Sequence, residues 1–166
     1  MLSKIAMSLL GVIALLGAPR QARQPAAPEP PDVSLCSLLS RPADYDGKEV
    51  RIRAQYNLGF EWSYFDDESC KEYAVKTTPY RTADVVWAKF DESVKSATGP
   101  EVYAKFREAS AFCCPDGWRT KRTELAVVGR FFKAAGDEGY GHMGRYAFQI
   151  LVKKVESVGE TKLTSP

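Results

Sequence analysis

The chain has 166 residues, with 23 Lys+Arg against 21 Asp+Glu, one His and four Cys, and 45% of its residues are hydrophobic. This length fits one domain with tails, and 27% charged with 11% aromatic residues indicates a globular rather than a disordered chain. The formal net charge of +2 gives little support for a strongly basic nucleic-acid binder, and a single histidine makes a His-rich metal site hard to build.

Residues 1–18 have the pattern of a signal peptide. Lys4 supplies the positive start, and the apolar run from Ile5 to Leu16 falls within the about 7–15 residues of a signal-peptide core and is too short to span a membrane. Cleavage after Ala18 and cleavage after Ala22 both remain open, and the alternative is a buried N-terminal helix. We expect an exported protein, periplasmic or secreted, with no transmembrane span after processing.

Residues 19–32 hold five of the ten prolines and are expected to form an extended, proline-rich linker. A folded domain is expected over residues 33–160, followed by a tail at 161–166. Removal of the first residues takes away Lys4, Arg20 and Arg23, which leaves 20 basic residues against 21 acidic ones. Nucleic acid is therefore not the expected partner.

Four cysteines in an exported chain predict two disulfides, for which three pairings exist. We favour Cys36–Cys70, because each lies at the edge of a predicted element. Cys113 and Cys114 are adjacent, and their state is left open. A structural staple is favoured over a catalytic thiol, since the chain has no Cys-x-x-Cys and a Cys–His pair would need the single His142.

The first half of the domain shows a short helix at residues 34–39 and then a strand from Glu49 to Tyr56, where apolar and polar residues alternate. Residues 57–59 predict a hairpin turn, and Phe60 to Phe65 predict the second strand. A weaker third strand is expected at residues 73–77.

The second half begins with helical spacing over residues 82–112, where Val86, Phe90 and Val94 recur every four residues. Residues 85–87 could instead form a strand. A strand is predicted at residues 119–133, with a bend or bulge at Gly129. The glycine-rich loop 136–144 follows, and then a long strand at residues 145–158 with inward side chains at Tyr146, Phe148, Ile150 and Val152.

Three strands, a helical segment and two more strands indicate a mainly β protein. This order predicts a five-stranded OB-like Greek-key barrel with a helical insert between the third and fourth strands. Strongly bent strands with few free edges are what a small closed barrel requires.

Four segments carry a resemblance: Leu38–Arg53 with its Tyr-Asp-Gly-Lys run, Gly59-Phe-Glu61, Cys70, and Gly139-Tyr-Gly-His-Met-Gly-Arg-Tyr146. They resemble a group of small exported bacterial proteins with an OB-like domain and no assigned activity. This chain differs from the group at Ala54-Gln55, where the group tends to have glycine, and by its extra Cys113 and Cys114. The resemblance implies the fold and export, and it implies no reaction.

Two segments supply candidate ligand-binding residues. In the first, Gly141 and His142 belong to a Gly-x-Gly-His loop that could receive an anion on exposed backbone N–H groups; the favoured alternative is a tight turn with a structural role. In the second, Trp62 or Tyr64 could stack on a base or sugar, beside Phe60 and Glu61; the alternative is that one set of these rings fills the core.

No catalytic constellation or metal-ligand spacing is visible, so neither a catalytic residue nor a cofactor is expected. The leading hypothesis is a non-enzymatic module that binds an envelope protein or a small ligand at its barrel face. One alternative is a hydrolase that uses His142 with an acidic residue such as Glu61. The other is an oligonucleotide-binding barrel, which fold analogy alone supports.

Overall fold

The computed structural model describes residues 28–73, 82–111, 119–136 and 138–164. Strands dominate, so the protein is mainly β, as predicted. The elements in chain order are α1 (Leu35–Ser40), α2 (Pro42–Tyr45), β1 (Glu49–Leu58), β2 (Ser63–Asp66), the 3-10 turn η1 (Glu68–Tyr73), β3 (Val86–Phe90), α3 (Val94–Ala97), α4 (Pro100–Ser110), β4 (Thr120–Lys133), the 3-10 turn η2 (His142–Gly144) and β5 (Phe148–Thr164). The predicted signal peptide, Cys113 and Cys114 lie outside the described residues.

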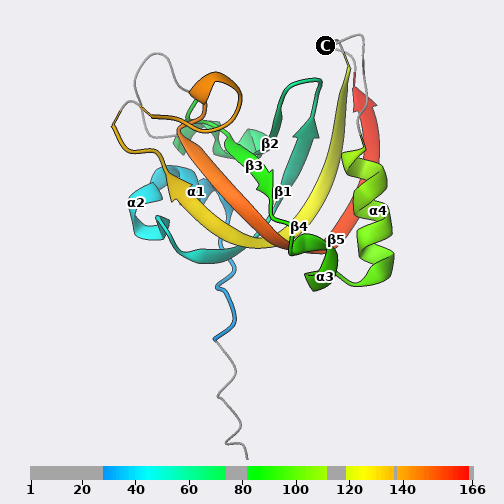
Figure 1. The fold of residues 1–166 in the computed structure, drawn as a ribbon. Helices are drawn as coiled ribbons and strands as arrows, with labels where there is room; N and C mark the ends of the chain where they lie inside the picture. The colour runs from blue at the N-terminus through cyan, green and yellow to red at the C-terminus, as the bar shows by residue number, and fades with distance from the viewer. Residues whose placement is uncertain (1–27, 74–81, 112–118, 137, 165–166) are drawn as a thin grey trace, which may run out of the picture.

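The five strands form one mixed sheet in the order β1-β2-β3-β5-β4 (Figure 1). Its two ends meet, because β1 pairs with both β2 and β4. All ten residues of β1 pair with β4, from Glu49 opposite Arg130 to Leu58 opposite Lys121. The pairs are antiparallel except for β3 with β5, which is parallel.

Alternation along the strands separates the core from the solvent. In β1, Val50, Ile52, Ala54 and Tyr56 are buried, as the period-two pattern from Glu49 to Tyr56 predicted. Apolar side chains from α1 and the other strands complete the core, among them Leu35, Leu38, Leu39, Phe65, Val86, Leu125, Val127, Phe131, Phe148, Ile150 and Val152.

The two longest strands, β4 and β5, curve across the molecule (Figure 1). Their pairing shifts register at three places, and one of these shifts lies at Gly129. A Cβ atom at Gly129 would come within 2.6 Å of the Leu151 carbonyl oxygen, so only glycine allows the two backbones to approach this closely. The bend or bulge that the sequence predicted at Gly129 is confirmed as a shift in the pairing of β4 with β5.

The helices cover parts of the sheet. Helix α4 begins at Pro100, as its first-turn proline predicted, and buries Phe106 and Ala109. The Phe106 ring lies 4.7 Å from that of Phe90 at the end of β3, measured between centroids. No helix within the described part of the chain is long and apolar enough to cross a membrane.

The helical interpretation of Val86 and Phe90 is wrong, because both lie in strand β3. A spacing of four residues fits the helical period of 3.6 and also fits twice the strand period of two, so the pattern did not separate the two structures. Val86 and Ala88 are buried on one side of β3, and Trp87 lies on the other.

The hairpin after β1 also differs from the prediction. The second strand covers Ser63–Asp66 and not Phe60–Phe65, because Gly59 and Trp62 close a turn in which the Gly59 N–H donates to the Trp62 carbonyl (2.9 Å). The expected third strand at 73–77 falls almost entirely outside the described residues. Tyr73 ends η1, and the strand next to β2 is β3.

Both ends of the domain extend further than predicted. At the end of the expected linker, the Arg51 N–H donates to the Pro31 carbonyl, and the Val33 N–H donates to the Arg51 carbonyl (2.9 and 2.8 Å). This short pairing covers the start of β1, which β2 leaves unpaired. At the other end β5 continues to Thr164, so residues 161–164 belong to a strand and not to a tail.

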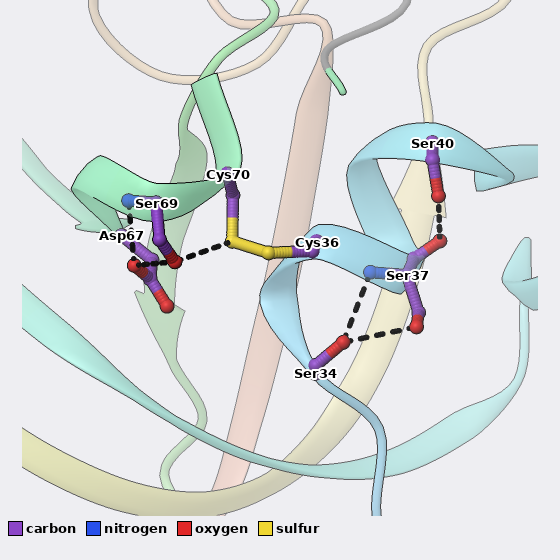
Figure 2. The surroundings of a disulfide bond; sticks show 7 residues. All are labelled: Ser34, Cys36, Ser37, Ser40, Asp67, Ser69 and Cys70. Atoms are coloured by element: carbon purple, nitrogen blue, oxygen red, sulfur yellow. Dashed lines mark hydrogen bonds between the residues drawn. A yellow bond between two sulfur atoms is a disulfide. The ribbon is translucent and has the colours of Figure 1, made fainter. Parts of the chain in front are cut away.

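The predicted Cys36–Cys70 disulfide is present and joins α1 to η1 (Figure 2). Local hydrogen bonds hold both partners in place. Ser34 caps α1, since its hydroxyl oxygen accepts from the Ser37 N–H (3.1 Å), and the Asp67 carboxylate accepts from the N–H and the hydroxyl of Ser69 (2.9 and 2.6 Å). Cys70 is fully buried, so the bond anchors η1 to the core.

We predict that the double variant Cys36→Ala with Cys70→Ala has a free energy of unfolding lower by about 3–4 kcal/mol, because the bond restricts a loop of 34 residues in the unfolded chain. Urea denaturation of the two proteins without reductant measures this difference. Substitution is preferable to reduction, since it is confined to Cys36 and Cys70. A loss below about 1 kcal/mol would contradict the role of the disulfide.

Candidate functional site

Four aromatic rings gather on the outer side of the closed sheet. Trp62 lies in the turn before β2, Tyr64 in β2, Trp87 in β3, and Tyr146 just before β5. The ring centroids are 5.4 Å apart for Trp62 and Tyr64, 6.3 Å for Tyr64 and Tyr146, and 4.8 Å for Tyr146 and Trp87. We call these four residues the aromatic face.

The strand register places two of these rings outside. Tyr64 and Trp87 stand opposite each other in the β2–β3 pair. Their chain neighbours Phe65 and Val86 are buried in the core, and successive side chains of a strand point to opposite sides. Tyr64 and Trp87 therefore project outward from the sheet. Both are half-buried, because neighbouring rings on the outer side cover part of each side chain.

The loop between β4 and β5 folds back onto Trp87. Gly141 has φ +69° and ψ −160°, a conformation that is open almost only to glycine. A Cβ atom at Gly141 would come within 2.5 Å of the Trp87 ring and 2.8 Å of the Tyr146 ring. The glycine is therefore required for the loop backbone to lie against Trp87.

The same loop fixes Tyr146 through its backbone. The Tyr140 N–H donates to the Tyr146 carbonyl (2.9 Å), and the Tyr146 N–H donates to the Tyr140 carbonyl (3.1 Å). On the other side, the Thr82 N–H donates to the Arg145 carbonyl (2.8 Å). Tyr146 is thus held between the loop and the segment that leads into β3, so its ring does not need a ligand to be positioned.

The Glu61 and His142 side chains meet at the edge of the aromatic face. The Glu61 Oε2 and His142 Nε2 atoms are 3.5 Å apart, with 55% and 46% of the two side chains exposed. An ion pair this exposed is worth about 0–1 kcal/mol even when the imidazole is protonated. The pair therefore does not hold the loop in place, which leaves its polar atoms available to a ligand.

Two hollows lie on either side of Trp62 and Tyr146. The first, of about 340 Å³, is lined by Trp62, Tyr64, Asp66, Thr82, Asp84, Val85 and Tyr146. The second, of about 280 Å³, is lined by Glu61, Trp62, His142, Met143, Arg145 and Tyr146. They share the rings of Trp62 and Tyr146, and the volume of the first lies at the lower end of the roughly 300–1,000 Å³ range of small-molecule sites.

A buried polar group supports the floor of the first hollow. Asp66 is 7% exposed, and its Oδ1 atom accepts from the Asn57 side-chain N–H (2.9 Å) and lies 3.7 Å from the Arg122 guanidinium. Burial raises the pKa of Tyr64, with a further contribution from Asp66, and burial also raises the pKa of Tyr146. Both phenols therefore stay protonated near neutral pH and can donate hydrogen bonds.

The sequence candidates divide into three groups. Glu61, Trp62, Tyr64 and His142 line the hollows, whereas Gly141 packs beneath them against Trp87. Phe60 is 51% exposed at the tip of the β1–β2 turn, and it does not line either hollow.

Two residues of the aromatic face were missed from the sequence. Trp87 was overlooked because its segment was interpreted as a helix. If the segment is taken as a strand with Val86 and Ala88 facing the core, alternation places Trp87 on the outer side. Tyr146 was expected in the core, but it is half-buried and lines both hollows, because β5 begins at Phe148. The period-two alternation was extended two residues too far.

Among the described residues, one group offers three side chains of the kinds that bind metals: Cys36, Asp67 and Cys70. Both sulfur atoms are used by the disulfide, so this group has no thiolate to offer an ion. The Cys36–Cys70 disulfide explains why these side chains lie close together.

Comparison of the chain with models of protein families, with curated proteins and with solved structures finds no match. The function of the site is therefore argued from its geometry.

We predict that Gly141→Ala lowers the free energy of unfolding by about 2–3 kcal/mol or more, because the methyl group meets Trp87 and the backbone conformation suits only glycine. Gly136→Ala is the matched control, since Gly136 also has a positive φ (+52°) but nothing lies within 4 Å of its Cβ position. The control should cost about 1–2 kcal/mol. Urea denaturation followed by tryptophan fluorescence measures both. Equal losses would show that the loop does not press on Trp87.

Proposed function

We propose that this protein is an exported, non-enzymatic binding module with an OB-like Greek-key barrel, and that it takes a ligand or partner at the aromatic face. The observation that carries the proposal is the placement of Trp62, Tyr64 and Tyr146 outside the core, around two neighbouring hollows. Tryptophan and tyrosine in an open hollow offer a ligand a large apolar surface with polar groups beside it.

The topology supports the OB-like part of the proposal. OB-folds are five-stranded Greek-key barrels that bind ligands on the face of strands 2 and 3 and through the loops joining strands 1–2 and 4–5. Here the aromatic face is built from β2, β3, the β1–β2 turn and the β4–β5 loop. Helices α3 and α4 follow β3 and precede β4 in the chain. The resemblance of the Tyr-Asp-Gly-Lys and Gly-Tyr-Gly-His segments to small exported proteins agrees with this proposal.

Export is supported by two independent features. The Cys36–Cys70 disulfide is a bond that oxidising compartments favour. The signal-peptide pattern of residues 1–18 adds a second reason from the sequence.

Exposed apolar side chains next to the hollows also favour a binding surface. Phe60 and Met143 are 51% and 78% exposed, and they neighbour Glu61 and His142 in the chain. Met143 has a positive φ of 54°, which is uncommon for a residue other than glycine. Strain of this kind persists where surrounding structure imposes it, and it is frequent at ligand-binding sites.

A hydrolase remains the second candidate, because the His142 Nε2 and Glu61 Oε2 atoms lie 3.5 Å apart. A carboxylate this close can orient an imidazole that acts as a general base. The residues that line this hollow supply no hydroxyl or thiol nucleophile apart from the phenol of Tyr146, so water would have to attack. Binding needs none of these additional assumptions, and we therefore rank it first.

We predict that Trp62→Ala weakens ligand binding about tenfold or more, and that His142→Ala weakens it less, while both variants remain folded. Uncharged hexasaccharides, a short oligothymidylate and a proline-rich peptide serve as probes, and calorimetry measures the affinity of each variant. The indole N–H signal of Trp62 in proton–nitrogen NMR spectra of the wild-type protein shows whether the probe binds at this face. Leu163→Ala is the control, since Leu163 is 61% exposed and lies in β5 opposite Lys121. The proposal is contradicted when no probe shifts the Trp62 signal, or when the control weakens binding as much as Trp62→Ala.

The hydrolase candidate makes a different prediction for His142→Gln. Under that candidate the variant binds the same probe but no longer cleaves it, because the base is lost and the aromatic rings remain. Chromatography of each probe after incubation with the wild-type protein and the variant measures cleavage. Intact probes in both samples would exclude the hydrolase for the compounds tested, and cleavage by both proteins would exclude His142 as the base.

A further inference from the structure

We infer that two copies of this chain associate through the open edge of β5, in an antiparallel pairing centred on Thr161. The partner is a second copy, so the inference goes beyond the ligand-binding function proposed above and does not depend on it. The aromatic face, which includes Tyr146 just before the start of β5, stays open in both copies. Three observations carry the inference: the backbone groups that β5 leaves unpaired, the charges on either side of Thr161, and the exposure of Leu163.

The edge of β5 that faces away from β4 is covered over only part of its length. Strand β3 pairs with this edge as far as Val152, and the Thr98 hydroxyl then accepts from the Val155 N–H (3.0 Å). Strand β5 continues to Thr164, well past β3 (Figure 1). From Ser157 onward, the described part of the chain provides backbone partners from β4 alone. An open edge of this kind is a template for pairing with another strand.

Helix α4 lies against β5 but leaves the end of the strand exposed. The helix buries Phe106 and Ala109, whereas residues 159–163 of β5 are all exposed. The pairing of β5 with β4 shifts register next to Gly159 and is regular from Thr161 to Thr164. The end of β5 is therefore an extended strand with one edge open to a partner.

The charges at this edge select one register for two antiparallel copies. Around a twofold axis, opposite residues of the two β5 strands point to the same side of the sheet, so the pairing is centred on a residue. A centre at Thr161 places Glu160 of each copy opposite Lys162 of the other. A centre at Glu160 or at Lys162 would place like charges opposite each other, which is destabilising. In the favoured register the complementary pair occurs twice.

Both charged side chains are available for this contact. The Lys162 Nζ and Glu160 Oε2 atoms of one chain are 3.8 Å apart, with 70% and 80% of the side chains exposed, so their own ion pair contributes little. Lys162 also stands opposite Arg122 of β4, and like charges in this position repel. The Arg122 Nε atom is buried without a hydrogen-bond partner among the described residues. Glu160 of the second copy adds a negative charge beside Lys162 and offsets this repulsion.

Leu163 gives an apolar contribution to the same interface. It is 61% exposed and lines neither of the hollows at the aromatic face. In the register centred on Thr161, Leu163 lies opposite Gly159 of the second copy, where no side chain competes for space. Association therefore covers an apolar side chain that the single chain leaves in water.

The test measures the sedimentation velocity of the protein at concentrations from micromolar to millimolar. We expect a monomer–dimer equilibrium that weakens as salt is added, because exposed charge pairs are screened. Glu160→Lys and Lys162→Glu each place like charges opposite each other twice, so each should raise the dissociation constant of the dimer about tenfold or more. An equal mixture of the two variants should associate about as tightly as the wild type, because every opposing pair again has opposite charges.

The control is Lys48→Glu, which makes the same change at an exposed lysine just before β1. Lys48 lies at the end of the sheet away from the proposed interface, since the start of β1 pairs with the end of β4 at Arg130, and Leu163 pairs with its beginning at Lys121. This variant should change the dissociation constant of the dimer by less than about twofold.

The outcomes that would overturn the inference are distinct from those for the ligand site. A monomer at every concentration would overturn it, and protection of the amides of residues 157–164 from hydrogen exchange in that monomer would show that the edge is covered within one chain. A dimer whose dissociation constant is unchanged in both charge variants would place the interface elsewhere. Failure of the mixed variants to associate, when circular dichroism shows both to be folded, would overturn the antiparallel register. Ligand binding at Trp62 is measured separately and stands or falls alone.

Discussion

The pairing of β1 with β4 along all ten residues of β1 closes the sheet, and the placement of nearly every side chain follows from that closure. A closed sheet has one inside and one outside, so each strand must divide its side chains between the core and the solvent. In β2 and β3 this division sends Phe65 and Val86 inward and leaves Tyr64 and Trp87 outside. The aromatic face is thus a consequence of the same alternation that fills the core.

The β4–β5 loop converts these outward rings into a shaped surface. Gly141 lets the backbone lie against Trp87, and the paired N–H and carbonyl groups of Tyr140 and Tyr146 hold the Tyr146 ring beside it. Trp87 is covered in this way, and Trp62, Tyr64 and Tyr146 remain accessible. The exposed Glu61–His142 pair contributes little to stability, so the packing of the loop on Trp87 is what preorganises the site.

The features that could be predicted from the sequence depend on local patterns. The alternation from Glu49 to Tyr56 marked β1, and the positions of Cys36 and Cys70 at element edges led to the disulfide that is present. Trp62, Tyr64, Glu61 and His142 were selected from two segments that are distant in the chain, and they line neighbouring hollows.

The features that could not be predicted depend on contacts between distant segments. The spacing of Val86 and Phe90 fits a helix and a strand equally, and only the pairing of β3 with β2 and β5 decides between them. The contact of Gly141 with Trp87 joins residues far apart in the chain, and nothing in either local sequence indicates it. For the same reason, a sequence reading of the Gly-x-Gly-His segment could not separate its structural part, Gly141, from its exposed part, His142.

The account predicts that a ligand binds in the hollows lined by Trp62, Tyr64 and Tyr146. Isotope-filtered nuclear Overhauser spectra of the labelled protein, saturated with whichever probe binds most tightly, observe this contact directly. Cross-peaks between protons of the probe and these three aromatic residues are the expected result, with no cross-peaks to Leu163. Cross-peaks confined to other residues would contradict the account.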